Sequence, residues 1–231
     1  MTLVRLDKTL GAMLQRPYLT SASGALLRNP RGGVEDVAEM AAAGMKWLAF
    51  NVGDGQHWDD WRIVRERARD ANVEVLPWAR CRTLADCHDL LETADVFASK
   101  CLLNIEDEFK DVLPPFRVAE LLSDYTMQSR GLDVGISTVG WVYNSVDYLP
   151  LANYPALLQL FPTDMRLDPA DLEEIQAQCV AHARDKGFTY VGVTIQAYGG
   201  AKPEWYGYID GTFSIFAGDD VGSSNWAAWG A

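Results

Sequence analysis

Short apolar runs alternate with longer amphipathic segments along most of the chain. The runs are rich in valine, leucine, isoleucine and aromatic residues, and each is bounded by glycine, proline or acidic residues, which is typical of buried strands. They predict strands at 17–21, 47–52, 73–77, 101–108, 134–138, 157–161, 190–195 and 212–216.

The segments between these runs predict helices. Apolar residues recur at helical spacing, and the ends carry helix-start and helix-stop residues such as Thr83, Asp168-Pro169 and Gly187. We expect helices from Gly33 to Gly44, at 58–71, from Thr83 to 97, from Pro114 to Gly131 and at 169–186, with a short one at 225–229.

Eight strands alternating with helices predict an α/β fold that closes into a single (β/α)8 TIM barrel with irregular later helices. An open doubly wound sheet is the alternative, but residues 20–24 read TSASG and lack the GxGxxG of such a sheet's first turn. We expect one domain over 1–231, with 1–16 as an N-terminal arm.

Composition excludes several function classes. The net charge is −12 and no Lys/Arg-rich run is present, so we expect no nucleic-acid partner. We find no signal-like start and no apolar stretch of about 18 residues, so we expect no membrane partner and synthesis in the cytoplasm. The sequence leaves the oligomeric state open.

Cysteine and histidine spacing argues against a metal centre. The four cysteines lack CxxC spacing, and the three histidines form no HxH or HExxH pattern. We therefore expect reduced core thiols, no metal site and no other cofactor. The alternative is a Cys81–Cys87 disulfide in an oxidising compartment, but the closeness of the two residues in sequence means that it would close only a small loop.

Acidic residues follow the fourth apolar run directly. Residues 101–108 read CLLNIEDE, and carboxylates at the end of a core strand are costly unless they face a solvated cavity. Side chains alternate along a strand, so Asn104, Glu106 and Glu108 are expected on one face. The two glutamates are therefore predicted to share a cleft.

Paired carboxylates suit glycoside hydrolysis, in which one acid protonates the leaving oxygen and a second carboxylate acts as base or nucleophile. We expect Glu106 to be the general acid, because desolvation and repulsion from Glu108 favour its protonated form. The best candidates for the second catalytic carboxylate are Glu108 and Asp54, followed by Asp219.

Other polar and aromatic residues follow the strands, where the active site of a barrel lies. Rings stack on the apolar faces of sugars, and amides and carboxylates bond hydroxyls. The candidate substrate-binding residues are Trp78, Arg80, Asn104, Trp141, Tyr143, Asp164, Gln196, Tyr198, Trp205 and Asp219.

Each assignment has a structural alternative. Glu106 can form a salt bridge with Arg80 or Arg82 across the strand ends instead of reacting. Asp54 stands between glycines, where a turn former is common. Asp219 can cap the last helix.

The fourth strand resembles that of family 25 glycoside hydrolases, the lysozyme-type muramidases, and of related barrels encoded by phages and actinobacteria. In that family the strand ends in Asp-x-Glu, and the glutamate is the proton donor. The matching residues here are Asn104, Ile105 and Glu106, so the resemblance implies the donor role for Glu106 with an asparagine in place of the first acid. The aspartate of the family's first strand is replaced by residues 20–23, which read TSAS.

Three functions remain open from the sequence. The first is a glycosidase-like barrel that cleaves a polysaccharide; the resemblance points to bacterial cell-wall glycan and to a phage lysin or virion protein that reaches the host wall. The second is a non-catalytic carbohydrate-binding barrel of a phage tail or structural protein. The third is a metabolic barrel enzyme with Mg²⁺ bound by acids such as Glu106, Asp164 and Asp219.

Overall fold

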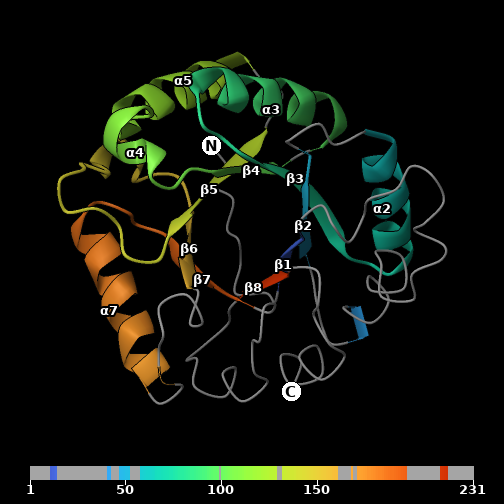
Figure 1. The fold of residues 1–231 in the computed structure, drawn as a ribbon. Coiled ribbons are helices and arrows are strands. Elements are labelled where there is room, and N and C mark those ends of the chain that lie inside the picture. Colours follow the sequence, from blue (N-terminus) through green and yellow to red (C-terminus); the bar gives the residue numbers. More distant parts are fainter. Residues whose placement is uncertain are drawn as a thin grey trace. The chain divides into compact units, whose positions relative to one another are not determined.

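The computed structural model describes residues 11–14, 41–42, 47–52, 58–98, 100–128, 132–160, 168, 171–196 and 214–217. Parallel strands alternate with helices along the chain (Figure 1). The chain divides into two compact units. The first comprises Met1–Asp7, Leu76–Leu160 and Glu174–Val193, and the second comprises Lys8–Val75, Phe161–Glu173 and Thr194–Ala231.

The first unit contains four strands paired in parallel and in chain order: β3 (Glu74–Arg80), β4 (Lys100–Asn104), β5 (Asp133–Val139) and β6 (Ala156–Leu160). All five residues of β6 and four of the five in β4 are buried. Burial on both faces explains why these strands are nearly continuous apolar runs rather than alternating ones.

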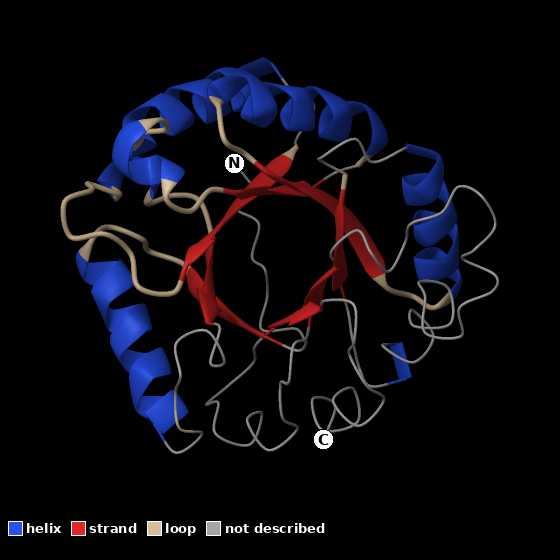
Figure 2. Ribbon diagram, viewed as in Figure 1, coloured by secondary structure: helices blue, strands red, loops and turns tan. Residues whose placement is uncertain are grey.

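Helices cover one side of these strands (Figure 2). They are α3 (Leu84–Phe97), α4 (Glu108–Asp111), α5 (Pro115–Gln128) and α7 (Leu172–Asp185), with a 3₁₀ turn η3 at Leu149–Leu151. Helix α3 begins with a capping box. The Asp86 amide donates to Thr83 Oγ1, and the Asp86 carboxylate accepts from the Thr83 amide.

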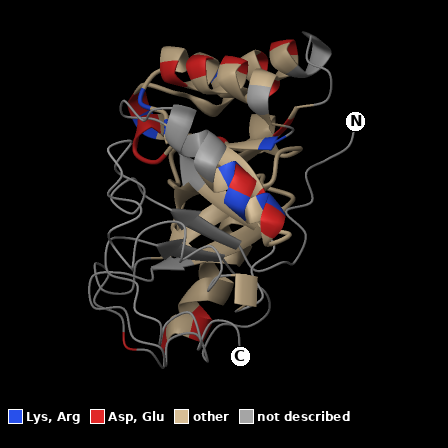
Figure 3. Cartoon of the chain, turned by 90° about the vertical axis from the view of Figure 1, so that its right-hand side faces the viewer, with Lys and Arg blue, Asp and Glu red and all other residues tan. Residues whose placement is uncertain are grey.

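The second unit contains β1 (Gly11–Leu14), which pairs in parallel with β2 (Trp47–Asn51) and with β8 (Ser214–Ala217). The end of β7 (Val191–Gln196) pairs with β8. Helix α2 (Trp58–Asp70) buries Val64 and Ala68, while its exposed positions mix basic and acidic residues (Figure 3).

The predicted class is confirmed as α/β with parallel strands and intervening helices, as in a partial TIM barrel. The position of the first strand was wrong: β1 lies at Gly11–Leu14, inside the expected N-terminal arm, and the expected strand at 17–21 lies outside the described residues. The charged residues before Gly11 obscured a four-residue apolar run. Helix α4 and turn η3 were missed because they are too short to show a helical period.

The four cysteines are buried and unpaired, as expected. Burial raises the pKa of the Cys179 thiol to about 11 and raises that of Cys101 as well. Thiols of this kind carry little thiolate at neutral pH and are chemically inert.

Among the described helices, none combines the length and the apolar character required to cross a bilayer.

Gly140 lies where β5 passes into the loop beside β6. A Cβ at this position would lie 2.6 Å from the Gln159 carbonyl oxygen and 2.5 Å from Leu160 Cδ2. We predict that Gly140→Ala lowers the free energy of unfolding by about 1–3 kcal/mol, because the backbone of β6 must shift. Chemical denaturation measures this change.

The matched control is Gly192→Ala in β7, where the nearest atom to a new Cβ is Leu157 Cδ1 at 3.4 Å. That distance is ordinary van der Waals contact, so the change in unfolding free energy should stay within about 0.5 kcal/mol. Equal losses at the two glycines would contradict the close approach at Gly140.

Candidate functional site

Two neighbouring strand ends of the first unit position the site. Arg80 is the last residue of β3, Asn104 is the last residue of β4, and the two are register partners. Beyond Asn104 the Ile105 amide still donates to Ser137 O at 2.9 Å, and the chain then turns into α4. The turn brings Glu106 and Glu108 to the side of β3.

Arg80 binds both glutamates. Its Nε and Nη2 donate to Glu108 Oε1 at 3.2 and 2.9 Å, and Nη2 also donates to Glu108 Oε2 at 3.0 Å. Nη1 forms an ion pair with Glu106 Oε2. The Arg80, Glu106 and Glu108 side chains are 24%, 22% and 13% exposed, so the cluster is screened from water only in part.

Electrostatics favour the charged forms of Arg80 and Glu108. Burial opposes ionisation of Glu108, but backbone amides, including that of Glu106 at 3.0 Å, and the Arg80 guanidinium outweigh it and lower the pKa of this carboxyl. Burial likewise opposes the charge on Arg80, and the two carboxylates outweigh it and raise the pKa of the guanidinium.

A chain of amide hydrogen bonds leads from Glu106 into the core. Asn104 Nδ2 donates to Glu106 Oε1 at 3.0 Å, and Gln159 Nε2 donates to Asn104 Oδ1 at 2.6 Å and to Ser137 Oγ at 2.7 Å. Asn104, Ser137 and Gln159 are at most 3% exposed. The hydrogen-bond chain links β4, β5 and β6 to the partly exposed carboxylate of Glu106.

Sequence reasoning missed Gln159 and Ser137. The sequence signal for Gln159 is weak: it is a single amide side chain inside the apolar run of β6. Ser137 is a small polar residue inside β5, which is a weaker signal still. Buried polar side chains need hydrogen-bond partners. A polar residue inside an apolar run therefore predicts a buried hydrogen-bond network, but it does not identify the other residues of that network.

A second polar group lies next to Glu106. The Tyr143 hydroxyl donates to Asp107 Oδ1, and Lys110 Nζ lies 3.9 Å from the centre of the Tyr143 ring and 3.5 Å from Asp107 Oδ1. The bond from Tyr143 lowers the pKa of Asp107, while burial and then the Asp107 bond raise the pKa of Tyr143. Tyr143 is therefore held as a neutral hydroxyl.

Trp141 offers an exposed aromatic face on the loop after β5. The residue is 46% exposed, and its ring stacks on His182 of α7 at 4.6 Å and 12°. His182 Nε2 lies 2.9 Å from Val142 O, so the histidine is tied to the same loop. The stack holds Trp141 in place while leaving part of its surface open.

The structure brings together four of the predicted residues, Arg80, Asn104, Glu106 and Glu108. The two glutamates converge through a turn and not by alternation along a strand, because β4 ends at Asn104. The structural alternative for Glu106 is present, with Arg80 as the partner. Repulsion between the two glutamates, on which the general-acid assignment relied, is thus compensated by a shared cation.

One predicted sugar-binding residue is corrected. Trp78 is 2% exposed within β3, so its ring packs in the core and presents no open face. The expected residues Asp54, Asp164, Tyr198, Trp205 and Asp219 lie outside the described residues, as does the side chain of Gln196 at the end of β7.

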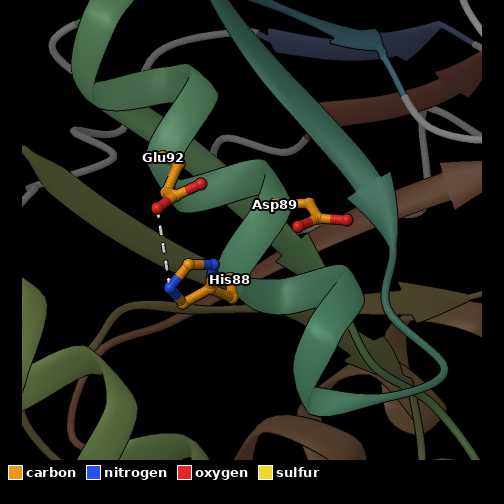
Figure 4. A group of neighbouring side chains, drawn as sticks. All are labelled: His88, Asp89 and Glu92. Carbon is orange, nitrogen blue, oxygen red and sulfur yellow. Dashed lines mark ion pairs between the residues drawn. The ribbon is translucent and has the colours of Figure 1, made fainter.

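A group with metal-ligand spacing lies elsewhere. Within the described ranges, His88, Asp89 and Glu92 of α3 are the one set of three such residues with ligand atoms within 4.8 Å of one another (Figure 4). All three are exposed, and His88 Nε2 lies 3.7 Å from Glu92 Oε1, as expected for an i,i+4 pair on a helix surface. Nothing else marks this surface as a metal centre.

No protein-family model and no curated protein matches the chain in sequence. Its structure is similar to that of several solved enzymes. Endoglucanase Cel5A from Thermotoga maritima matches with a TM-score of 0.56 at 10% identity, over 95% of this chain and 96% of that one. The YdjI aldolase from Escherichia coli K12 matches with a TM-score of 0.51 at 13% identity, over 90% and 75%.

A Rubisco-like protein from Rhodopseudomonas palustris matches with a TM-score of 0.54 at 14% identity, over 96% of this chain. The chain spans only 62% of that protein's length. At these identities the likeness shows the fold alone. It extends to TIM-barrel-like enzymes in general and does not single out family 25 glycoside hydrolases.

The Arg80–Glu108 pair makes a testable contribution to stability. We predict that Glu108→Gln lowers the free energy of unfolding by about 1–3 kcal/mol at pH 7, because a partly buried guanidinium loses a charged partner. The pKa of Glu108 is lowered by folding, so this contribution is present at neutral pH and is lost as pH falls below about 4. Urea denaturation across this pH range measures the change.

The control is Glu120→Gln in the exposed pair with Arg117, whose side chains are 63% and 58% exposed. This substitution should change the unfolding free energy by less than about 0.5 kcal/mol. A Glu108→Gln loss that stayed constant down to acidic pH would contradict the role given to the charge.

Proposed function

We propose that the strand-end site of the first unit binds a carbohydrate, in a glycosidase-like barrel, with Glu106 as the carboxylate that contacts the sugar. The proposal rests above all on one observation: Glu106 is partly exposed at a strand end and is held by donors from two different strands, Arg80 and Asn104. Such a carboxylate is preorganised, since its position does not depend on the ligand.

The charge of the cluster favours a neutral, hydroxyl-rich ligand. One guanidinium and two carboxylates leave one negative charge, and Arg80 is already shared by both acids. A phosphate or carboxylate ligand would be repelled, whereas sugar hydroxyls can donate to Glu106. The open face of Trp141 supplies the ring on which the apolar face of a sugar stacks.

Hydrolysis with Glu106 as general acid is the second candidate function. Arg80 bonds Glu108 through Nε and Nη2 but reaches Glu106 only through Nη1, so it can keep Glu108 while Glu106 is released to a ligand. A bound sugar would then desolvate Glu106 and favour the protonated form that a proton donor needs.

We also infer that the strands close into an eight-stranded (β/α)8 barrel. Two sets of parallel pairings support this inference: β3 to β6 pair in chain order in the first unit, and in the second unit β1 pairs with β2 and with β8. In such a barrel the carboxyl ends of all strands face one side.

The resemblance of Asn104-Ile105-Glu106 to family 25 glycoside hydrolases suggests the kind of carbohydrate. We propose bacterial cell-wall glycan, bound or cleaved by a phage lysin or a virion tail protein.

A binding and turnover assay with peptidoglycan fragments and a panel of glycans tests the proposal. We expect wild type to bind at least one glycan, and both Trp141→Ala and Glu106→Gln to weaken binding by about tenfold, through loss of stacking and of a charged acceptor. Release of reducing ends that is abolished by Glu106→Gln would establish the hydrolase.

Two surface variants serve as controls. Phe116→Ala removes an aromatic ring that is 50% exposed on α5, and Glu120→Gln removes an exposed carboxylate; both should bind like wild type. Absence of binding to every glycan, or equal effects of Trp141→Ala and Phe116→Ala, would overturn the proposed function.

A further inference from the structure

Gln159 has an unusual hydrogen-bond balance for a buried amide. Its nitrogen donates to both Asn104 Oδ1 and Ser137 Oγ, yet its buried oxygen Oε1 has no hydrogen-bond partner among the described residues. A buried acceptor without a donor is destabilising, and an apolar residue of the same size would avoid that cost. The arrangement therefore needs an explanation other than packing.

The order of donors and acceptors in this chain of side-chain amides explains why Gln159 is present. An ionised carboxylate only accepts hydrogen bonds, so Asn104 must present Nδ2 to Glu106. Its Oδ1 then faces β6 and needs a donor there. Gln159 supplies that donor at 2.6 Å, and the Ser137 hydroxyl accepts the second N–H.

We propose that Gln159 is a positioning residue that fixes the Asn104 amide with its N–H groups toward Glu106, through a chain that starts at Ser137. Gln159 touches neither Glu106 nor the ligand surface, and it acts through Asn104 alone. Among the described residues, the charged and titratable groups that face Glu106 are Arg80, Glu108 and Tyr143, and no hydrogen bond joins any of them to the Asn104 side-chain amide. Gln159 thus sets the orientation of Asn104 independently of them.

The inference deepens the proposed function, because a fixed Asn104 commits Glu106 Oε1, so the ligand would take the place of Arg80 Nη1 at Glu106 Oε2. A substitution of buried Gln159 is therefore expected to change the orientation of the Asn104 amide at the site while every exposed residue stays the same. The positioning itself is a property of the free protein and is measurable without a ligand.

The experiment uses the side-chain amide signals of asparagine in the ¹⁵N-labelled full chain, with Asn104 assigned by Asn104→Asp. In wild type we expect well-separated, slowly exchanging Nδ2 protons, one of them shifted downfield by the charged acceptor, with the shift lost when Glu106 is protonated at low pH. Gln159→Met keeps the size of the side chain but removes the donor. We expect it to abolish both the slow exchange and the pH response of the Asn104 amide.

Thr138→Val is the matched control. Thr138 Oγ1 is also buried and has no hydrogen-bond partner in the described part of the chain, but Thr138 lies on the opposite face of β5 from Ser137 and outside the amide chain. It should leave the Asn104 amide unchanged, whatever its effect on the unfolding free energy. An Asn104 signal in Gln159→Met that matches wild type in exchange and pH response would overturn the inference.

The outcome is separable from that of the glycan assay. A disturbed Asn104 amide in a protein that binds no glycan would uphold the positioning role and refute the proposed function. An undisturbed Asn104 amide in a protein that does bind a glycan would refute the positioning role and uphold the proposed function.

Discussion

The site depends on one guanidinium shared by two carboxylates. Without Arg80, Glu106 and Glu108 would place two negative charges close together at a half-buried strand end, where neither solvent nor backbone amides compensate them fully. With Arg80 in place, both acids are held in defined positions. The bidentate geometry to Glu108 also fixes the guanidinium plane, so the remaining Nη1 points to Glu106.

This constraint links local backbone structure to chemistry. The chain turns after β4 so that the Glu106 amide donates to Glu108 while both side chains reach back to β3. On the core side, Asn104 and Gln159 extend the hydrogen bonds across β4 and β6. Glu106 is therefore held from a surface side and a core side at once. A carboxylate fixed in this way needs little reorganisation when a ligand arrives.

Aromatic contacts hold the loop that follows β5. Trp141 is supported by a stack on His182, and the Tyr143 ring by Lys110 and Asp107. Buried Tyr148 lies behind them, between Phe109 of α4 and Phe188, with ring centroids 5.3 and 5.0 Å away. The loop after β5 is thereby tied to α4 and to the end of α7.

The sequence by itself determined the local elements and the class of fold. Local features depend on neighbours a few residues away, so they can be recognised in the sequence. They include the apolar runs, the cap at Thr83 and the acids after β4. The tertiary structure decided which residues meet: Arg80 with Glu108, 28 residues apart, and Gln159 with Asn104, 55 apart. It also buried Trp78 and exposed Trp141, which are alike in sequence as aromatics near strand ends. Strand register and helix packing set these contacts, and neither leaves a periodic signal in the sequence because both depend on segments far apart in the chain.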